Sequence, residues 1–424
     1  MDIVNYEHVP IKRIGKVITG KTPATSHEEY YGGQYMFISP VELHGGYRVT
    51  KSEKTITEKG LESIKTNSIE GISILVGCIG WDMGNVAMCF EKCATNQQIN
   101  AITQIDAKYN PYYIYYWLCG KKKYLFSIAS VTRTPILSKS TFEEIVIPLP
   151  IKKNQDKIAN ILLKIDQKIT LNKQINDNLE QQAKLLYDYW FTQFDFPDES
   201  GKPYRSSGGK MVWNEQLKME IPFSWVCSKM ENAIEAVRTG LNPRNNFKLG
   251  NGNIQYITVK NLCLNGSLDF SGCDTIDEHA RQIIHRRSDI QIDDILFASI
   301  APLGRCYLIQ ENPTNWDINE SVFSIRYNSS VLTAEYLYMN LQSEAFVKRA
   351  TACSTGSIFK GIRINSLMDS EIILPPLSVT KEFSKEIKPL FALQKELDRE
   401  THTLIQLRDW LLPVLMNGQA TISD

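Results

Sequence analysis

The sequence predicts an α+β protein: two pseudo-repeated α/β globules separated by two long helices that pair as a coiled coil. Three observations lead to this fold class. Five phrases recur in one order along the 424 residues, at offsets that drift only from about 219 to 227. Each copy is followed by a long segment with apolar residues at heptad spacing. Within each copy, short β-branched runs end at glycines, which is typical of strands and turns.

The repeat is defined by five pairs of matching segments. These are VITGKTP (17–23) with VRTGLNP (237–243), MFISPVEL (36–43) with YITVKNL (256–262), ILVGCIGWDMGNVAMC (74–89) with ILFASIAPLGRCYLI (295–309), TNQQINAI (95–102) with INESVFSI (318–325), and EEIVIPLP (143–150) with SEIILPPL (370–377). Five matches in one order are not expected by chance. We therefore divide the chain into a first globule (1–150), a long helix (151–194), a linker with the second globule (195–376), and a second long helix (377–424).

The segment after Pro150 contains no glycine or proline for some forty residues and carries a heptad seam. One series of seam positions is Ile158, Ile165, Asn172, Leu179 and Leu186, and the other is Leu162, Ile169, Asn176, Ala183 and Trp190. The two asparagines interrupt the apolar seam, as polar residues do when they fix the register of a coiled coil. Forty residues at 1.5 Å each predict a helix about 60 Å long.

The second copy ends in a similar seam. Its positions are Phe383, Leu390, Leu397, Leu404 and Leu411, and the residues that broaden the stripe are Ile387, Leu393, Leu407 and Leu415. We expect Pro389 to kink this helix or delay its start, and Pro413 to end it. Neither helix can bury its stripe in its own globule, so we expect the two to pair. The alternative is that each lies along the sheet of a separate globule.

Inside the globules, residues 110–126 (NPYYIYYWLCGKKKYLF) and 333–350 (TAEYLYMNLQSEAFVKRA) each predict one helix. The join between the first long helix and the second globule is rich in proline, glycine and serine and has no periodicity. We expect it to be a linker or a hairpin-rich segment.

The composition limits the classes of function. Lys+Arg and Asp+Glu are both 47, and the first globule (16 basic, 14 acidic) and residues 197–376 (18 and 20) carry only +2 and −2. A protein with this balance is expected to bind DNA weakly by itself and to need a basic partner for most phosphate contacts. Nine scattered cysteines without a metal-binding set, no apolar run long enough for a membrane span and no secretion signal predict a cytoplasmic protein with reduced thiols and no membrane partner.

Residues Gly15–Thr22 satisfy the P-loop pattern G-x-x-x-x-G-K-[ST]. A P-loop requires a helix that starts at Lys21–Thr22, but the following residues, PATSHEEYYGG, have no helical periodicity. The second copy keeps only the turn glycine and the proline of this stretch. We therefore interpret it as a strand-to-loop turn. No catalytic residues and no metal ligands are predicted elsewhere, and the nearest approach to an amino-methyltransferase motif, Asn110–Tyr113, lacks its second proline.

The whole chain resembles the specificity subunits of type I restriction–modification systems. The resemblance is carried by the duplicated layout and by seven phrases: the G-x-T-P turn (Gly20, Thr22, Pro23), GNVA (84–87), NQQI (96–99), IPLP (147–150), YDYWFTQFDFP (187–197), GKPYRSSGGKMVW (201–213) and LRDWLLPVLMNG (407–418). One departure is Leu241-Asn242, which stands where the first copy has Lys21-Thr22.

The resemblance implies that each globule is a target recognition domain reading one half of a split double-stranded DNA site. It also implies that the two helices pack antiparallel as a spacer of fixed length and dock two methylation subunits, with restriction subunits joining through the complex. S-adenosylmethionine, ATP and Mg²⁺ would be bound by those partners, and no cofactor by this chain. A non-DNA adaptor, in which a rod carries two protein- or ligand-binding globules, is the alternative.

Polar residues in the turns of both copies are the candidates for DNA contact, because major-groove edges are read by Arg, Lys, Asn and Gln side chains. In the first copy the candidates are Lys21, Thr22, Trp81, Asn85, Gln97, Gln98 and Arg133. In the second copy they are Arg238, Asn242, Arg244, Asn245, Lys248, Lys260, Asn261, Arg305, Lys360 and Arg363. Ordinary surface polarity is the alternative for each. We expect Asn96 and Asn319 to have structural roles in turns, and Lys121–Lys123 to be a solvated helix face, with phosphate contact as the alternative.

Overall fold

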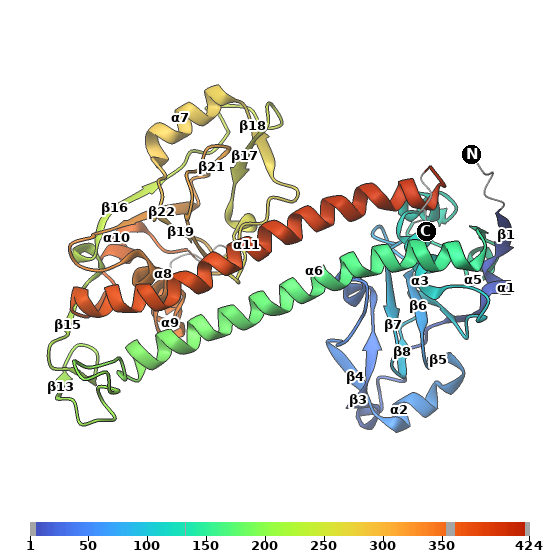
Figure 1. Cartoon of the computed structure of the whole chain (residues 1–424), viewed down its shortest axis with the longest axis horizontal. Helices are drawn as coiled ribbons and strands as arrows, with labels where there is room; N and C mark the ends of the chain where they lie inside the picture. The colour runs from blue at the N-terminus through green and yellow to red at the C-terminus, as the bar shows by residue number, and fades with distance from the viewer. Residues whose placement is uncertain (1–5, 132, 353–360, 420–424) are drawn as a thin grey trace. The chain divides into compact units, whose positions relative to one another are not determined.

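The computed structural model describes residues 6–131, 133–352 and 361–419. The chain forms two compact units (Figure 1): unit 1 contains residues 1–174 and 397–424, and unit 2 contains residues 175–396. Both units mix helices with mostly antiparallel strands, which agrees with the predicted α+β class. Within the described ranges, no helix combines the length and the apolar character that crossing a bilayer requires.

Unit 1 is built on two four-stranded sheets, ordered β2-β9-β6-β7 and β4-β3-β8-β5. Every residue of β6 and β9 is buried, as expected for strands covered on both faces. The strands are β1 (Glu7–Pro10), β2 (Lys16–Thr19), β3 (Tyr31–Ile38), β4 (Lys54–Ile56), β5 (Ser68–Ile69), β6 (Ser73–Gly77), β7 (Val86–Cys89), β8 (Cys93–Thr95), β9 (Ile99–Thr103), β10 (Ser130–Val131), β11 (Pro135–Ile136) and β12 (Val146–Leu149). The short helices are α1 (Ile11–Ile14), α2 (Glu58–Ser63) and α5 (Lys139–Glu143), with single 3₁₀ turns at Glu28–Tyr30, Pro40–His44 and Lys65–Asn67.

Unit 2 repeats this plan, with sheets ordered β16-β22-β19-β20 and β18-β17-β21. Each copy also has one parallel pair, β3 with β8 and β17 with β21. The strands are β13 (Met211–Asn214), β14 (Met219–Pro222), β15 (Val226–Lys229), β16 (Ile234–Thr239), β17 (Ile254–Ile257), β18 (Asp274–Ile276), β19 (Ile295–Ala298), β20 (Cys306–Leu308), β21 (Trp316–Ile318), β22 (Val322–Tyr327) and β23 (Glu371–Leu374). The other elements are α7 (Glu278–Ser288), α10 (Ile364–Met368) and 3₁₀ turns at Met230–Asn232 and Val259–Asn261. The linker contributes the β13–β14 hairpin.

Two helices that the sequence predicts as single are each broken in two. The first forms α3 (Pro111–Cys119) and α4 (Lys122–Ser127), and the break falls at Gly120, where the carbonyls of α3 are capped. The second forms α8 (Ala334–Gln342) and α9 (Glu344–Ala352). Ser343 has an extended backbone (φ −60°, ψ 143°), and its hydroxyl accepts a hydrogen bond from the Phe346 N–H, as an N-cap side chain does.

The long helices are α6 (Lys152–Tyr187), which continues into one π-helical turn at Asp188–Thr192, and α11 (Leu377–Met416). Pro389 does not delay the start of α11, and a kink at this residue stays a prediction. The expectation that Pro413 ends the helix was wrong, because α11 continues for three residues beyond it. A proline inside a helix removes one backbone hydrogen bond. Buried residues on both sides of Pro389, Ile387 and Phe391, offset that loss at the first site, and Leu415 and Met416, which follow Pro413, offset it at the second.

The two long helices contact each other within each unit. In unit 1, the Asn172 side-chain N–H donates to Glu400 at 2.7 Å and the Arg408 guanidinium donates to Asp166 at 3.0 Å, so the helices run antiparallel there. In unit 2, the Gln394 amide donates to the Asn176 carbonyl. The buried seam residues are Ile158, Leu162, Ile165, Ile169, Asn172, Leu179, Ala183, Trp190, Phe383 and Leu397, and the partly buried ones are Asn176, Leu186, Leu390, Leu404 and Leu411. Leu393 and Leu407, which we expected to broaden the stripe, are exposed instead.

Candidate nucleic-acid interface

Four segments of unit 1 meet at one end of the β2-β9-β6-β7 sheet, which we call edge 1. They are the exit of β2, the β6–β7 loop, the β8–β9 turn and the β10–β11 hairpin. Backbone hydrogen bonds join them: Gly20 N–H to Ile99 O at 3.0 Å, Cys78 N–H to Gln98 O at 2.7 Å, and Leu137 N–H to Cys78 O at 2.9 Å. The predicted DNA-contact residues of the first copy all lie on these segments.

Glycine is required at the strand exit because two backbones approach closely there. A Cβ atom on Gly20 would lie 2.1 Å from the Asn96 carbonyl oxygen, and one on Gly240 would lie 1.6 Å from the Ile318 carbonyl oxygen. The side chains of Asn96 and Asn319 each accept a hydrogen bond at 3.0 Å from the backbone N–H two residues further on. Both asparagines therefore form Asx turns, as expected from the sequence.

The P-loop pattern does not form a phosphate-binding loop. In this stretch the strand, β2, begins after Gly15, and the first helical turn after Thr22 is the 3₁₀ turn at Glu28–Tyr30. The Lys21 N–H donates to the Thr95 carbonyl at 2.9 Å, so it is not free to bind phosphate. The interpretation as a strand-to-loop turn agrees with this geometry.

The side chains of edge 1 differ in how free they are. Lys21, Gln97 and Arg133 are exposed, Trp81 is 71% exposed, and the Thr22 hydroxyl donates to the Gln97 amide oxygen at 2.9 Å. Gln98 is half-buried and accepts a hydrogen bond from the Asn96 side chain.

Asn85 is held by partners that the sequence did not indicate. Its amide oxygen accepts a hydrogen bond from the Lys122 ammonium at 2.8 Å, and the same ammonium donates to Asp82 at 2.7 Å. This hydrogen bond lowers the pKa of the Asp82 carboxyl. Lys122 is therefore not part of a simply solvated helix face. It orients the β6–β7 loop, and only the lysine run 121–123 could have indicated it.

Unit 2 has the equivalent surface, which we call edge 2. The Gly240 N–H donates to Asn319 O at 3.1 Å, and the Ile362 N–H donates to Ser299 O at 2.8 Å. The loop closure is the same in both copies: Gly77 N–H to Asn85 O at 2.9 Å, and Ala298 N–H to Arg305 O at 3.0 Å. Asn85 and Arg305 therefore occupy the same position on the two edges.

The predicted residues of the second copy are divided by the structure. Those that are exposed are Arg244, Asn245, Lys248, Lys260 and Arg363, and those that are half-buried are Arg238, Asn242 and Arg305. Asn261 is a correction: it is 2% exposed, caps its own 3₁₀ turn and donates to the Asp269 carbonyl at 2.9 Å, so it supports the loop instead of facing a ligand. Lys360 lies outside the described residues.

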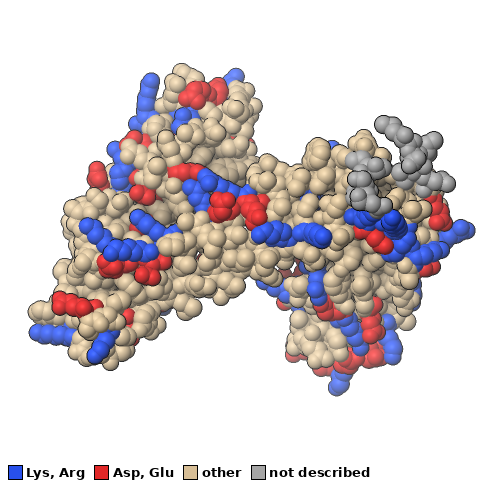
Figure 2. Space-filling view, viewed as in Figure 1, with Lys and Arg blue, Asp and Glu red and all other residues tan. Residues whose placement is uncertain are grey.

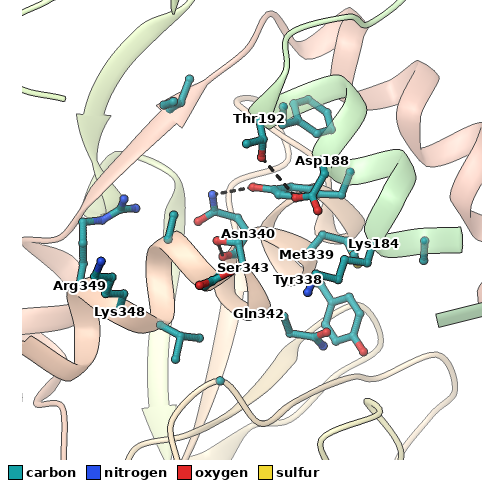
Figure 3. A pocket seen from close by; sticks show the side chains of 18 of the residues that line it. Lys184, Asp188, Thr192, Tyr338, Met339, Asn340, Gln342, Ser343, Lys348 and Arg349 are labelled. Carbon is teal, nitrogen blue, oxygen red and sulfur yellow. Dashed lines mark hydrogen bonds between the residues drawn. The ribbon is translucent and has the colours of Figure 1, made fainter. Parts of the chain in front are cut away.

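A cavity of about 1140 Å³ lies within unit 2 between the end of α6 and helices α8 and α9 (Figure 3). Lys184, Asp188 and Thr192 line one side, and Asn340 and Ser343 line the other. The buried Asn340 amide donates to the Tyr187 hydroxyl at 3.0 Å, while its oxygen has no hydrogen-bond partner among the described residues. The described lining offers hydroxyl, amide, carboxylate and ammonium groups and contains no histidine or cysteine.

Positive and negative side chains are interspersed over the surface. Figure 2 shows Lys and Arg atoms next to Asp and Glu atoms on the face drawn, without an extended area of one sign. No group of three or more His, Cys, Asp or Glu residues in the described ranges is arranged to hold a metal ion. The eight cysteines described are free thiols.

The fold and the two edges define a class of protein: a duplicated α+β chain with the same polar edge built twice and a long helix after each copy. Comparison with known proteins shows what the chain is similar to. Residues 3–181 match the family model for the type I restriction modification DNA specificity domain. Over nearly its whole length, the chain is similar to specificity subunits of type I restriction–modification systems.

Relatives extend the match over nearly the whole chain. The MjaIX specificity subunit of Methanocaldococcus jannaschii is 26% identical, over 98% of this chain and 93% of the relative. The EcoBI specificity subunit of Escherichia coli is 22% identical, over 94% and 76%. The solved structure of the type I restriction–modification S subunit from M. genitalium has the same fold, with a TM-score of 0.60 at 15% identity over 98% of this chain and 97% of that one.

Proposed function

We propose that this chain is the non-catalytic DNA specificity subunit of a type I restriction–modification complex. Edge 1 would read one half of a bipartite site and edge 2 the other half. The observation that carries this proposal is the presence of one backbone design twice with different side chains. Lys21 corresponds to Leu241, and Asn85 corresponds to Arg305. Because base edges are read by side chains, two such edges are suited to two unrelated sequences.

Docking of two methylation subunits on the long helices is the second part of the proposal. α6 and α11 begin 225 residues apart, at Lys152 and Leu377. At this same offset, Leu185 on α6 is 68% exposed and Trp410 on α11 is 63% exposed. Large apolar side chains this exposed, at matching positions of a repeat, favour two equivalent contacts with one kind of partner.

The partners would also supply what this chain lacks. With charges of +2 and −2 on its globules, the chain has little electrostatic attraction for DNA. We propose that methylation subunits close around the duplex and bind S-adenosylmethionine, and that ATP and Mg²⁺ are bound by the restriction subunits.

Co-expression with the methylation subunits tests this function. We expect the wild-type chain to co-purify with two methylation subunits, and the complex to bind host DNA far more tightly than the chain alone. Replacing both anchors, Leu185→Ala with Trp410→Ala, should lower partner affinity by about 2–4 kcal/mol because truncating interface anchors has effects of this size. Each single variant should retain one partner, as measured by mass photometry.

The control is Leu393→Ala with Leu407→Ala, which removes exposed leucines that do not match any exposed apolar residue at the repeat offset. This control should keep both partners. Full co-purification of the Leu185/Trp410 double variant would contradict the docking surfaces. A wild-type complex with no affinity for DNA would contradict the function itself and leave the non-DNA adaptor.

A further inference from the structure

Helix α7 of unit 2 carries a cationic surface that none of the sequence patterns singled out. An open hollow of about 600 Å³ is lined by Arg238, Arg281, Gln282, His285, Arg286 and Asp289. Arg286 is exposed, as is Arg287 beside it, and the described part of the chain provides neither an ion-pair nor a hydrogen-bond partner for these two arginines. The hollow therefore presents positive charge that remains available to an anion.

The acid in this hollow is already paired. The Asp289 carboxylate makes salt bridges with Arg238 and, at 3.1 Å, with Arg326. Arg281 donates to the Pro313 carbonyl at 2.9 Å, but its Nε–H is buried without an acceptor among the described residues. Basic residues in the last turn also favour the helix dipole. Arg238 and Arg281 lie outside that turn, so the dipole does not account for the cluster.

Among the described residues of the first copy there is no counterpart of this surface. Its equivalent helix is α2, which follows β4 as α7 follows β18, and both are capped by the residue before them, Thr57 and Asp277. α2 has six residues, with one lysine and two glutamates, whereas α7 has eleven, with three arginines and one glutamate. The two copies thus differ in charge as well as in length.

The C-terminal end of α7, which extends beyond the length of α2, is held by contacts with a strand of the sheet. Asp317 of β21 is fully buried and accepts a hydrogen bond from Ser288 at 2.6 Å, and its other oxygen lies 3.2 Å from His285 Nδ1. In the first copy the same register position holds Ala94, because Phe37 pairs with Ala94 as Tyr256 pairs with Asp317. The end of α7 is therefore held in place next to Arg238 of β16, the strand that leads into edge 2.

We infer that the C-terminal half of α7 binds the DNA phosphate backbone beside the half-site read by edge 2, and that the first globule has no such contact. This inference rests on the proposed function. Arg286 and Arg287 would neutralise phosphates, with Arg281 and Arg238 framing the hollow. Phosphate contacts position a protein without reading sequence. The phosphate contacts of the complex would thus be asymmetric. The second globule would contribute more than the first to the salt dependence of DNA binding.

The test is the salt dependence of DNA binding by the complex with methylation subunits, using a duplex that carries the mapped motif. Arg286→Gln with Arg287→Gln should reduce the slope of log K against log salt by about 0.9 for each phosphate released, and leave the methylated motif unchanged. Arg286→Lys with Arg287→Lys should keep the wild-type slope because the charge remains. The matched control in the first copy, Lys59→Gln with Lys65→Gln, should also keep it.

The outcomes separate the two claims. A wild-type slope in the Arg286/Arg287 glutamine variant overturns the inference while leaving the proposed function intact. An equal loss of slope in the Lys59/Lys65 control also overturns it, because the effect would then be one of net charge. A wild-type complex without preference for any DNA sequence would overturn the proposed function first. Thermal unfolding of each variant checks that these exposed substitutions leave the fold unchanged.

Discussion

A chain in which Glu7–Leu149 is replaced by a second copy of Val226–Leu374 should direct methylation to a site with two identical half-sites in opposite orientations. The two segments are structurally equivalent. β1 pairs with β12 in the register Glu7 with Leu149, and β15 pairs with β23 in the register Val226 with Leu374. The exchange therefore begins and ends at matching points. The number of residues between Leu149 and the start of α6 is the same as the number between Leu374 and the start of α11. Methylation of the original motif should be lost completely, because the chimera no longer contains the globule that reads one of its half-sites.

The expected orientation rests on the proposed spacer. If the globules are attached to opposite ends of an antiparallel helix pair, they are related by a twofold axis, and a twofold protein reads an inverted repeat. Methylation mapping in a host that expresses the methylation subunits measures the result. The matched control is the reciprocal chain with two first globules, which should yield the other symmetric motif. Retention of the wild-type motif by either chimera would contradict one globule per half-site.

Substitution of Arg408 is expected to have the largest effect on stability. Its guanidinium donates to Asp166 at 3.0 Å, and Asp166, whose side chain is only 5% exposed, also accepts a hydrogen bond from the Tyr116 hydroxyl at 2.7 Å. Burial lowers the pKa of Arg408, but the hydrogen bond and the charge of Asp166 outweigh burial, so its pKa is raised overall. Arg408→Met would leave a buried carboxylate without its cation, at a cost of about 3–5 kcal/mol.

Thermal unfolding should therefore show the transition of unit 1 shifted down by roughly 10 °C in Arg408→Met, given about 2–4 °C for each kcal/mol in a unit of this size. Asp166→Leu combined with Arg408→Met should recover most of this loss, since replacing both members of a buried pair is often neutral. The comparison variant is Lys385→Gln, which breaks the exposed pair with Glu382 and should change stability by less than about 0.5 kcal/mol. Equal effects of Arg408→Met and Lys385→Gln would contradict the structural role of this ion pair.

The long helices could be predicted from the sequence because the residues that pack between them recur at a regular, local spacing. Apolar residues at heptad spacing from Ile158 onward predicted a helix, and in the structure this helix, α6, runs from Lys152 to Tyr187. The course of α11 through Pro389 could not be predicted, because the compensation comes from tertiary packing of Ile387 and Phe391. The break after α8 depends on Ser343, whose neighbours on both sides are good helix formers.

The edges were predicted only in part, for the same physical reason. Gly20 and Asn96, repeated as Gly240 and Asn319, indicated turns that both copies need. What joins those turns to the β6–β7 loop and to the β10–β11 hairpin is long-range backbone hydrogen bonding, which no local pattern encodes. Asn261 was misassigned because its polarity serves a cap within its own turn.

The cationic helix α7 was missed because its sequence, EHARQIIHRRS, has too few apolar residues for a clear helical period. Its N-cap Asp277 is a local signal that could have indicated where the helix begins. The anchor Asp317 lies 29 residues from Ser288, so the contact that holds the end of α7 could not be seen in the sequence.

The central claim, that one chain sets two separate half-sites, is tested most directly by mapping adenine methylation in host DNA when the wild-type chain is co-expressed with its methylation subunits. We expect one motif with two short, unrelated half-sites and a constant unread gap. Because α11 has 40 residues, about 60 Å of helix, the gap should be under about 18 base pairs. The motif should disappear when the gene for this chain is deleted. A continuous motif, or methylation that persists without this chain, would contradict the claim.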